Sequence, residues 1–327
     1  MEHEGSGVRG VLLGRLRLYP LADESMGVRS MALGVETPDV RILLDAGVSL
    51  APRRYGLPPH PEEFRAAREA RERILEFAKR SDVVTISHYH LDHYTPSFTS
   101  FYEWSSREAF EAIYAGKLLL IKRPDETVSF NQRRRARAFL RDLEGLGCEV
   151  LEADGRVVEL GSTRIRALGP YPHGSGGRLG SVLAFMVEYG DVRLVYAPDL
   201  QGPVSSEVAE ELAQLRPTLL VMGGPPTYLA GIKVEASAVE AGLDNLSALA
   251  KRVAVVVSHH LLRDAGWRER LRSRGVARVA TYAQLAGVEE RLLESMRREL
   301  HSERPPSPEF TRWLERYRKG VREPPPI

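Results

Sequence analysis

The stretch Asp82–Tyr94 reads DVVTISHYHLDHY and decides how the rest of the chain is interpreted. A short run rich in β-branched residues ends at Ser87, and four side chains that can bind a metal follow within six residues: His88, His90, Asp92 and His93. Imidazole and carboxylate suit a borderline divalent ion such as Zn²⁺, and alternating positions let neighbours reach different ions. A surface loop that is histidine-rich by chance is a poor explanation for such density after a buried strand.

Composition places the chain among ordinary globular proteins. Its 327 residues are 43% apolar and 28% charged, enough for one large α/β core. We expect a cytoplasmic protein without a membrane segment, because no apolar run approaches ~20 residues and MEHEGSGVRG lacks the pattern of a secretory signal. The single cysteine, Cys148, excludes a disulfide framework and a thiolate-rich metal site.

The balance of charge argues against a general affinity for polyanions. The chain has 46 basic and 44 acidic residues, a net charge of +2, so no bulk field draws it to nucleic acid or to a membrane. Only six of the basic residues are lysine, which leaves 40 arginines, and Asn and Gln are scarce. Dense opposite charges with few thermolabile residues predict a thermophilic source, although a GC-rich genome would give the same arginine bias.

Alternating strand and helix patterns predict a mixed sheet. Strands are expected over residues 8–21, 30–37, 40–44, 82–87, 117–123, 149–152, 157–160, 163–167, 182–189, 192–196, 217–222, 253–257 and 276–281. Helices are expected from Pro61, from the capping-box pair Ser105 and Glu108 to Gly116, and over residues 131–144, 235–251 and 289–300, with one more before residue 276.

Two helices have a further interpretation. Residues 131–144 carry a candidate anion-binding patch, for which a solvated helix face is the favoured explanation: Arg133, Arg134, Arg135 and Arg137. After HSERPPSPEF breaks the chain, apolar residues recur at helical spacing up to Tyr317. We therefore expect one domain over residues 1–300 and a Pro-rich linker with a basic amphipathic helix over 301–327. That helix would pack on the body or on another subunit of a homo-oligomer, and a nucleic-acid arm is the less favoured alternative.

Further candidate ligands lie where strands end. Asp45 ends RILLD, Asp199 ends LVYAPD, and VVVSHH ends at His259 and His260, while His173 lies in the loop GPYPHGSGG. Each half thus has a strand ending in Asp, a helical segment, and a strand ending in Ser-His, a pairing that favours His259 over His260. Equivalent ends of adjacent strands meet at one sheet edge, where open α/β folds place their sites. The local sequence makes Asp45 either a turn residue or a support for a metal ligand.

These motifs together resemble the metallo-β-lactamase superfamily over about residues 8–300. The resemblance rests on His88-x-His90-x-Asp92-His93, followed in order by the remaining ligands and supported by the strand-end Asp45: His173, Asp199 and His259. The segments ESMGVRS, RYGLPPHP, GGPPTYL and HHLLRD further resemble an uncharacterised, mainly archaeal branch of that superfamily. The fold implied is a four-layer αββα sandwich, with the site at one edge of its two sheets.

The resemblance also implies a dinuclear hydrolase. His88, His90 and His173 would hold one divalent ion, Asp92, His93 and His259 a second, and Asp199 would bridge them. The expected ion is Zn²⁺, and the same ligands tolerate Mn²⁺ or Fe²⁺. The ions would activate a bridging hydroxide, which Asp92 orients, while Asp45 supports the cluster.

The substrate is less defined than the chemistry. A phosphoester or phosphodiester is the leading hypothesis, with candidate substrate contacts from cationic or polar side chains near the motifs: Arg29, Lys233, His260 and Arg263. The alternative is a carboxylic ester, thioester or lactone, in which Tyr228 or Tyr89 donates to the oxyanion. A non-catalytic metal-bound sensor that binds nucleic acid through the Arg-rich helix is a third hypothesis, which the complete two-metal ligand set disfavours. Net charge does not indicate a nucleic-acid partner, and the short interval between Asp199 and His259 disfavours the RNA-processing nucleases of this superfamily.

Overall fold

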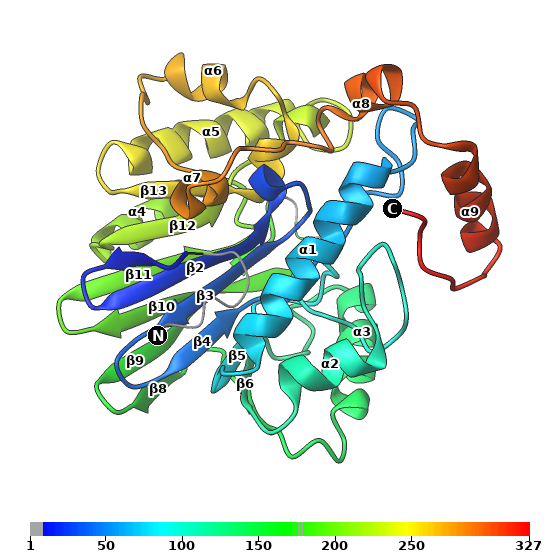
Figure 1. Cartoon of the computed structure of the whole chain (residues 1–327). Coiled ribbons are helices and arrows are strands. Elements are labelled where there is room, and N and C mark those ends of the chain that lie inside the picture. Colours follow the sequence, from blue (N-terminus) through cyan, green and yellow to red (C-terminus); the bar gives the residue numbers. More distant parts are fainter. Residues whose placement is uncertain (1–8, 176, 178) are drawn as a thin grey trace.

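Two β-sheets lie face to face between outer layers of helices in the computed structural model, which describes residues 9–175, 177 and 179–327 (Figure 1). Val8, at the start of the first expected strand, and most of the segment weighed as a secretory signal lie outside the described residues. No helix in the part of the chain that the structure describes is long and apolar enough to cross a bilayer.

Each sheet is built from one continuous part of the chain. The first sheet has the order β1-β2-β3-β4-β5-β6-β7, with bounds Val11–Leu13, Leu16–Asp23, Met31–Glu36, Arg41–Leu44, Val83–Ile86, Leu118–Ile121 and Glu149–Glu152. The second has the order β13-β12-β11-β10-β9-β8, and β8 to β13 span Val157–Leu160, Thr163–Pro172, Ser181–Tyr189, Val192–Ala197, Leu219–Gly223 and Val255–Ser258. The chain passes from the first sheet to the second between β7 and β8.

Parallel strands in both sheets require helical crossovers. Strands β4 to β7 are parallel, as are β11 to β13, and the helices that connect them cover the outer faces of the sheets. These helices are α1 (Pro61–Ala78), α2 (Arg107–Tyr114), α3 (Phe130–Asp142), α4 (Ser206–Gln214) and α5 (Ala236–Ala250). The carboxyl ends of the parallel strands of both sheets point toward the same edge of the sandwich.

Side chains cap most of these helices. The residues whose side chains accept a backbone N–H of the first turn are His60, Ser106, Ser129 and Ser205. The cap of α2 is thus Ser106 and not the expected Ser105, whose hydroxyl donates to the carbonyl of Phe98 at 2.8 Å.

Three layers of buried apolar side chains separate the four layers of the fold. Leu33 and Leu44 of the first sheet meet Phe185 and Val221 of the second between the sheets. The outer face of the first sheet packs against α1, α2 and α3, and that of the second against α4, α5 and α6 (Trp267–Arg272). The expected four-layer αββα sandwich is confirmed.

The last helix, α9 (Pro308–Arg318), packs on the body of its own chain (Figure 1). The rings of Phe310 and Trp313 lie edge-on to Phe64 of α1, with centroids 5.6 and 5.2 Å away. The hydroxyl of Tyr317 accepts the backbone N–H of Phe101 at 2.9 Å. The apolar face of α9 is therefore buried within one chain, and a homo-oligomer stays a prediction. The boundary expected after residue 300 falls inside α8 (Arg297–Glu303).

The strand expected over residues 276–281 is wrong. Only Ala280 pairs, in a single parallel bridge to Val256 of β13. The run stops there because Thr281 accepts the backbone N–H of Gln284 and so caps α7 (Tyr282–Ala286).

The helix expected over residues 289–300 is wrong over most of its length, because α8 begins only at Arg297. Glu294 lies 2.6 Å from the guanidinium of Arg29, and the backbone N–H of Arg291 donates to the carbonyl of Ser25 at 2.7 Å. These contacts to a loop far away in sequence outweigh the local propensity for a helix.

Candidate metal centre

Strand ends from both sheets place the candidate ligands at one edge of the sandwich. Asp45 follows β4, His88 lies two residues after β5, His173 follows β9, Asp199 lies two residues after β11, and His259 follows β13. The backbone N–H of Leu183 in β10 donates to the carbonyl of Ser87 at 3.0 Å, which joins the two sheets beside the cluster.

The backbone is strained at three of these positions. Asp45, Asp199 and His259 have φ values of 47°, 50° and 59°, in the left-handed region that residues with a Cβ rarely adopt. Such conformations cost about 1–3 kcal/mol each and cluster at functional sites, where the surrounding structure imposes them. Gly47, two residues after Asp45, lets the backbone of the two segments approach closely, because a Cβ there would lie 2.2 Å from the backbone nitrogen of His93.

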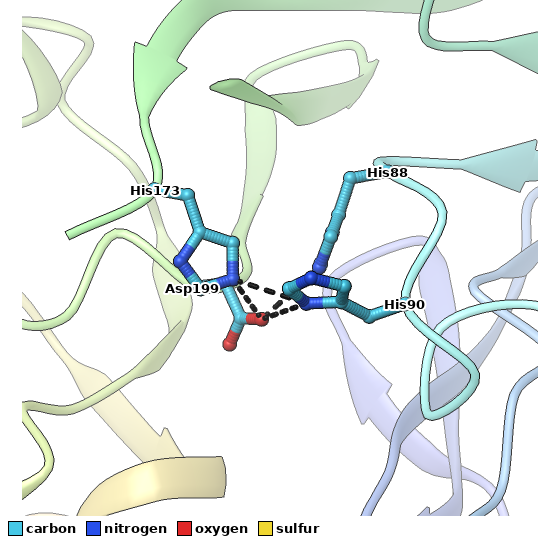
Figure 2. A group of neighbouring side chains, drawn as sticks. All are labelled: His88, His90, His173 and Asp199. Carbon is cyan, nitrogen blue, oxygen red and sulfur yellow. Dashed lines mark hydrogen bonds and ion pairs between the residues drawn. The ribbon is translucent and has the colours of Figure 1, made fainter. Parts of the chain in front are cut away.

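A first group of ligand atoms gathers on one side of Asp199, as Figure 2 shows for His88, His90 and His173. Oδ2 of Asp199 lies 3.0 Å from Nε2 of His173, 3.1 Å from Nε2 of His88 and 4.0 Å from Nδ1 of His90. The four ligand atoms all lie within 4.8 Å of one another, a spacing that could hold one metal ion.

A second group lies on the other side of Asp199. Nε2 of His259 is 3.4 Å from both Oδ2 of Asp92 and Nε2 of His93. Oδ1 of Asp199 is 3.1 Å from His259, and Oδ2 is 3.3 Å from His93. The carboxylate of Asp199 therefore lies between the two groups, as expected for a bridging ligand.

His260 lies near the same carboxylate, with its Nε2 3.3 Å from Oδ1 of Asp199. Asp199, His259 and His260 form one group of three neighbouring ligand atoms. Of the two histidines, only His259 also belongs to the group with Asp92 and His93. This geometry favours His259 as the ligand, in agreement with the pairing of the two halves of the sequence.

The chemistry of these atoms fits a cation. His88 Nε2, His260 Nε2 and Asp199 Oδ1 are buried and have no hydrogen-bond partner among the described residues, although nitrogen and oxygen atoms lie close to them. Burial lowers the pKa of His88, His90 and His260, so neutral imidazoles present lone pairs to a carboxylate. Buried acceptors that face one another without a donor are costly, and a divalent ion between them removes that cost.

The pKa shifts of Asp199 and of His93, in the second group of ligand atoms, also fit a cation at this position. Burial acts to raise the pKa of Asp199, but His259 and His93 outweigh it and hold that pKa well below its usual range. For His93, burial acts to lower the pKa, but Asp199 and Asp45 outweigh it and raise the pKa well above the ordinary value. A proton would therefore compete with any metal ion for Nε2 of His93.

Asp45 lies behind the cluster and orients His93. Its Oδ2 is 2.8 Å from Nδ1 of His93 and accepts the hydroxyls of Ser87 and Tyr196, and its Oδ1 accepts the backbone N–H of Ser87 at 2.9 Å. A carboxylate on the far nitrogen fixes the tautomer and direction of a ligating imidazole. Asp45 thus acts through His93 and does not face the cleft.

Glu24 does the same for His259, and sequence reasoning missed this role. Its Oε1 lies 3.1 Å from Nδ1 of His259 and 2.7 Å from Nη2 of Arg263. The side chain is buried at the end of β2, in the loop that contains ESMGVRS. The sequence marks that segment only by its family resemblance and by Arg29, and nothing in its local pattern pairs Glu24 with a histidine 235 positions away.

A cleft of about 630 Å³ lies over the ligands. Its lining includes His90, Asp92, His173, Asp199 and His260, together with four cationic side chains: Arg29, Arg135, Lys233 and Arg263. Arg29 is held by Glu294 through two hydrogen bonds of 2.6 and 2.7 Å, whereas Lys233 is exposed. Arg263 is buried, and its Nη1 lies 2.9 Å from Nδ1 of His260.

The two tyrosines considered as oxyanion donors are not among the residues that line the cleft. The hydroxyl of Tyr89 is buried and donates to the carbonyl of Lys122 at 2.7 Å, so its proposed role as an oxyanion donor is wrong. The hydroxyl of Tyr228 accepts from Nη1 of Arg263 at 3.3 Å, on the side of the cleft where that guanidinium lies.

Comparison with known proteins identifies the family. Residues 29–241 match the beta-lactamase superfamily domain. The chain belongs to the beta-lactamase superfamily. Within this superfamily it is similar to UPF0282 proteins of archaea: 47% identity over 296 residues to that of Pyrobaculum calidifontis, covering 88% of this chain and 96% of the relative. The UPF0282 protein of Methanopyrus kandleri is 44% identical over 292 residues, covering 88% and 100%. The expected archaeal branch is thereby confirmed, and these thermophilic relatives agree with the expected thermophilic source.

Solved structures of the superfamily are similar at much lower identity. A metal-dependent hydrolase of the beta-lactamase superfamily has a TM-score of 0.48 and 14% identity, covering 81% of this chain and 95% of the other. Unliganded yeast PDE1 has a TM-score of 0.47 and 12% identity, with coverage of 82% and 98%.

Proposed function

We propose that this protein hydrolyses phosphodiester or phosphoester bonds with two divalent metal ions, Zn²⁺ as the first expectation and Mn²⁺ or Fe²⁺ as alternatives. The observation that carries the proposal is the position of Asp199 between two groups of buried ligands, under a cleft lined by four cationic side chains. A single structural ion would need only one closed set of four ligands.

Some residues of the chain would bind the metal ions, and others would orient the histidines that bind them. His88, His90 and His173 would hold one ion, Asp92, His93 and His259 the other, and Asp199 both. When bound, two such ions lower the pKa of a water molecule and stabilise negative charge on the oxygen atoms of the substrate. Asp45 and Glu24 orient His93 and His259 from behind.

The cleft favours an anionic substrate. The exposed ammonium of Lys233 is free to approach a phosphate, whereas Arg29 keeps Glu294 as its partner and presents only the rest of its guanidinium. Asp92 lines the cleft and would orient the attacking hydroxide. With the hydroxyl of Tyr89 turned to Lys122 and four cationic side chains on the lining of the cleft, a phosphoryl group is the better match than a neutral ester.

The proposal is tested by stripping the purified protein of metal, reloading it with Zn²⁺, Mn²⁺ or Fe²⁺, and measuring metal content and hydrolysis together. We expect two ions per chain and cleavage of bis(p-nitrophenyl) phosphate. In Asp199→Asn we expect at least a ~1000-fold loss of activity, comparable to the loss of one strong electrostatic contact to a transition state. His301→Ala, a histidine outside the centre, serves as the control.

Other outcomes would select another function. Cleavage of p-nitrophenyl acyl esters, thioesters or lactones without cleavage of phosphoesters would establish the carboxylic-ester alternative. Two bound ions with no turnover on any of these substrates would point to a metal-bound sensor.

A further inference from the structure

Helix α3 touches the metal centre with one face. Gln132 accepts the backbone N–H of Tyr89 through its side-chain oxygen at 3.0 Å, and Arg135 donates to the carbonyl of Tyr89 at 3.2 Å. Both contacts fix the peptide groups between His88 and His90. The inner face of α3 therefore supports the loop that carries two candidate ligands of one ion.

The opposite face of α3 carries one aromatic residue and a stripe of arginines. Phe130, Arg134, Arg137 and Arg141 follow one another at i, i+4, i+7 and i+11, so they lie along one side of the helix, and all four are exposed. Phe130 is 72% exposed, although such a large apolar side chain is costly to leave in water. We call these four residues the α3 stripe.

The arginines of the α3 stripe lack counter-charges. None of the three makes an ion pair or a side-chain hydrogen bond with any residue that the structure describes, unlike many other surface arginines. Arg252, for example, pairs with Glu210 at 2.5 Å, and Arg268 with Glu290 at 2.7 Å. In a chain whose basic and acidic residues nearly balance, this unpaired group is a local excess of positive charge.

A second cavity of about 780 Å³ lies against the α3 stripe. Five arginines and three carboxylates line it, and two of those carboxylates already accept hydroxyl groups, Asp125 from Thr127 and Asp142 from Ser97. A second exposed ring, that of Phe98 at 52%, lies on the same lining. Arg135 lines both this cavity and the cleft over the candidate ligands, so the two hollows meet at that side chain.

We propose that the α3 stripe, with Phe98, binds a single-stranded nucleic acid and leads it into the cleft over the metal centre. The proposal rests on the phosphodiesterase function proposed above and names its substrate class. Guanidinium groups suit a chain of phosphates, and exposed rings stack on unpaired bases, which a duplex keeps buried. The 11 helical steps from Phe130 to Arg141 span roughly 16 Å at ~1.5 Å each, room for about five stacked nucleotides at ~3.4 Å each.

Fluorescence anisotropy with labelled 15-nucleotide RNA, DNA and duplex DNA, measured over a series of salt concentrations, tests the proposal. We expect the metal-free protein to bind a single strand at least tenfold more tightly than the duplex. In the triple variant R134A/R137A/R141A, affinity should fall at least tenfold, and the slope of log K against log salt should decrease by about 2, since each phosphate contact contributes ~0.7. The RNA and DNA arms show which sugar the surface prefers.

Matched variants separate position from charge and from folding. R312A/R316A/R318A removes three exposed arginines from α9, and we expect its affinity to be that of the wild type. R134K/R137K/R141K retains the charge, so its binding should keep the salt dependence of the wild type. Phe130→Ala removes an exposed ring, so this variant should bind the single strand and the duplex with similar affinity.

Three results would overturn the proposal: wild-type affinity in R134A/R137A/R141A, an equal loss in the α9 variant, or equal binding of single strand and duplex. Hydrolysis of bis(p-nitrophenyl) phosphate by the wild type is measured in parallel and tests the proposed function alone. Binding through the α3 stripe without diester hydrolysis would refute the phosphodiesterase and, with it, the substrate role of this surface. Diester hydrolysis without nucleic-acid binding would refute only the surface.

Discussion

The imidazole of His259 is held from behind by Glu24, a residue that no motif in its own segment marks as functional. We predict that Glu24→Gln weakens the binding of one metal ion by about 10–100-fold, because loss of the carboxylate lowers the basicity of His259 and loosens its orientation. Competition with a chromogenic chelator measures the effect. Glu36→Gln is the control, because this carboxylate accepts a hydrogen bond from the hydroxyl of Tyr19 and is remote from the metal centre. Equal affinities in both variants would contradict the assignment.

The partly buried pair of Arg29 and Glu294 makes stability depend on acid pH. Burial acts to raise the pKa of Glu294, but Arg29 outweighs it and lowers the pKa from 4.5 to about 2. A carboxyl group whose pKa is depressed by folding contributes stability above its unfolded pKa and loses it as the pH falls through the folded pKa. We predict that Glu294→Gln is less stable than the wild type by on the order of 2 kcal/mol at pH 7.

The difference in the free energy of unfolding between the wild type and Glu294→Gln should shrink between about pH 4.5 and 2, as Glu294 of the wild type takes up its proton. Urea denaturation across this pH range measures it. A difference that is constant with pH would show that the substitution of Glu294 disturbs packing and that the ion pair is not responsible.

The candidate ligands that could be predicted from the sequence are those whose spacing or strand-end position is visible locally. His88, His90, Asp92 and His93 are nearly contiguous, and Asp199 and His259 repeat a strand-end pattern. Glu24 could not be predicted, because its function depends on a partner 235 positions away. Tyr89 was assigned wrongly because alternation along the loop does not show that its side chain turns into the core.

At the scale of elements, α9 depends on packing, because its apolar residues are buried against the body and most of its exposed residues are polar or charged. Trp313 is 3% exposed and contacts the rings of Phe64 and Phe101. We predict that Trp313→Ala lowers the free energy of unfolding by about 3–5 kcal/mol, the cost of removing a large buried side chain. Arg312→Ala, on the exposed face of the same helix, should change stability by no more than about 0.5 kcal/mol.

Chemical denaturation of both variants measures these costs. If Trp313→Ala unfolds at the same denaturant concentration as Arg312→Ala, α9 contributes nothing to the stability of the body. Such a result would favour its second expected role, contact with another subunit.

Elements with strong local signals were predicted well, and the failures have a common cause. The apolar faces of α1, α5 and α9 and the β-branched runs of the parallel strands are visible in the sequence. Residues 289–296 have helical composition, but the ion pair of Glu294 and a backbone contact of Arg291 hold them in turns. Contacts between distant segments decide such regions, and a local window does not contain them.

For the whole molecule, the candidate centre joins parts of the chain that belong to different sheets. His88, His90, Asp92 and His93 come from the first sheet, and His173, Asp199 and His259 from the second. Ions bound between them would stabilise the folded state only, because unfolding separates the ligands. At a free metal concentration of ~1000 Kd, each ion adds about 4 kcal/mol.

We predict that removing metal with a chelator lowers the melting temperature by roughly 10 °C or more, since about 2 °C is lost per kcal/mol in a protein of this size. Differential scanning calorimetry with and without Zn²⁺ measures the change. In Asp199→Asn, which lacks the shared ligand, chelation should have little effect. Identical melting of the metal-loaded and metal-stripped wild type would refute ion binding between the sheets.

The order of strands and helices predicted only a mixed sheet, and the four layers were expected from the family resemblance that the metal-ligand motifs carry. The sequence could not show which loops close around the cleft. Arg29 and Arg263 line the cleft from two distant segments, and Glu294 holds Arg29 from a third.

The passage of the chain from one sheet to the other between β7 and β8 has a practical consequence. Cutting the chain at Gly155, an exposed turn, would leave each fragment with one complete sheet and part of the ligand set. Co-expressed, residues 1–154 and 155–327 should reassociate through the apolar faces of the sheets and the contact of α9 with α1. Only the reassembled pair would have both ligand groups, so tight metal binding would serve as a built-in reporter of fragment complementation.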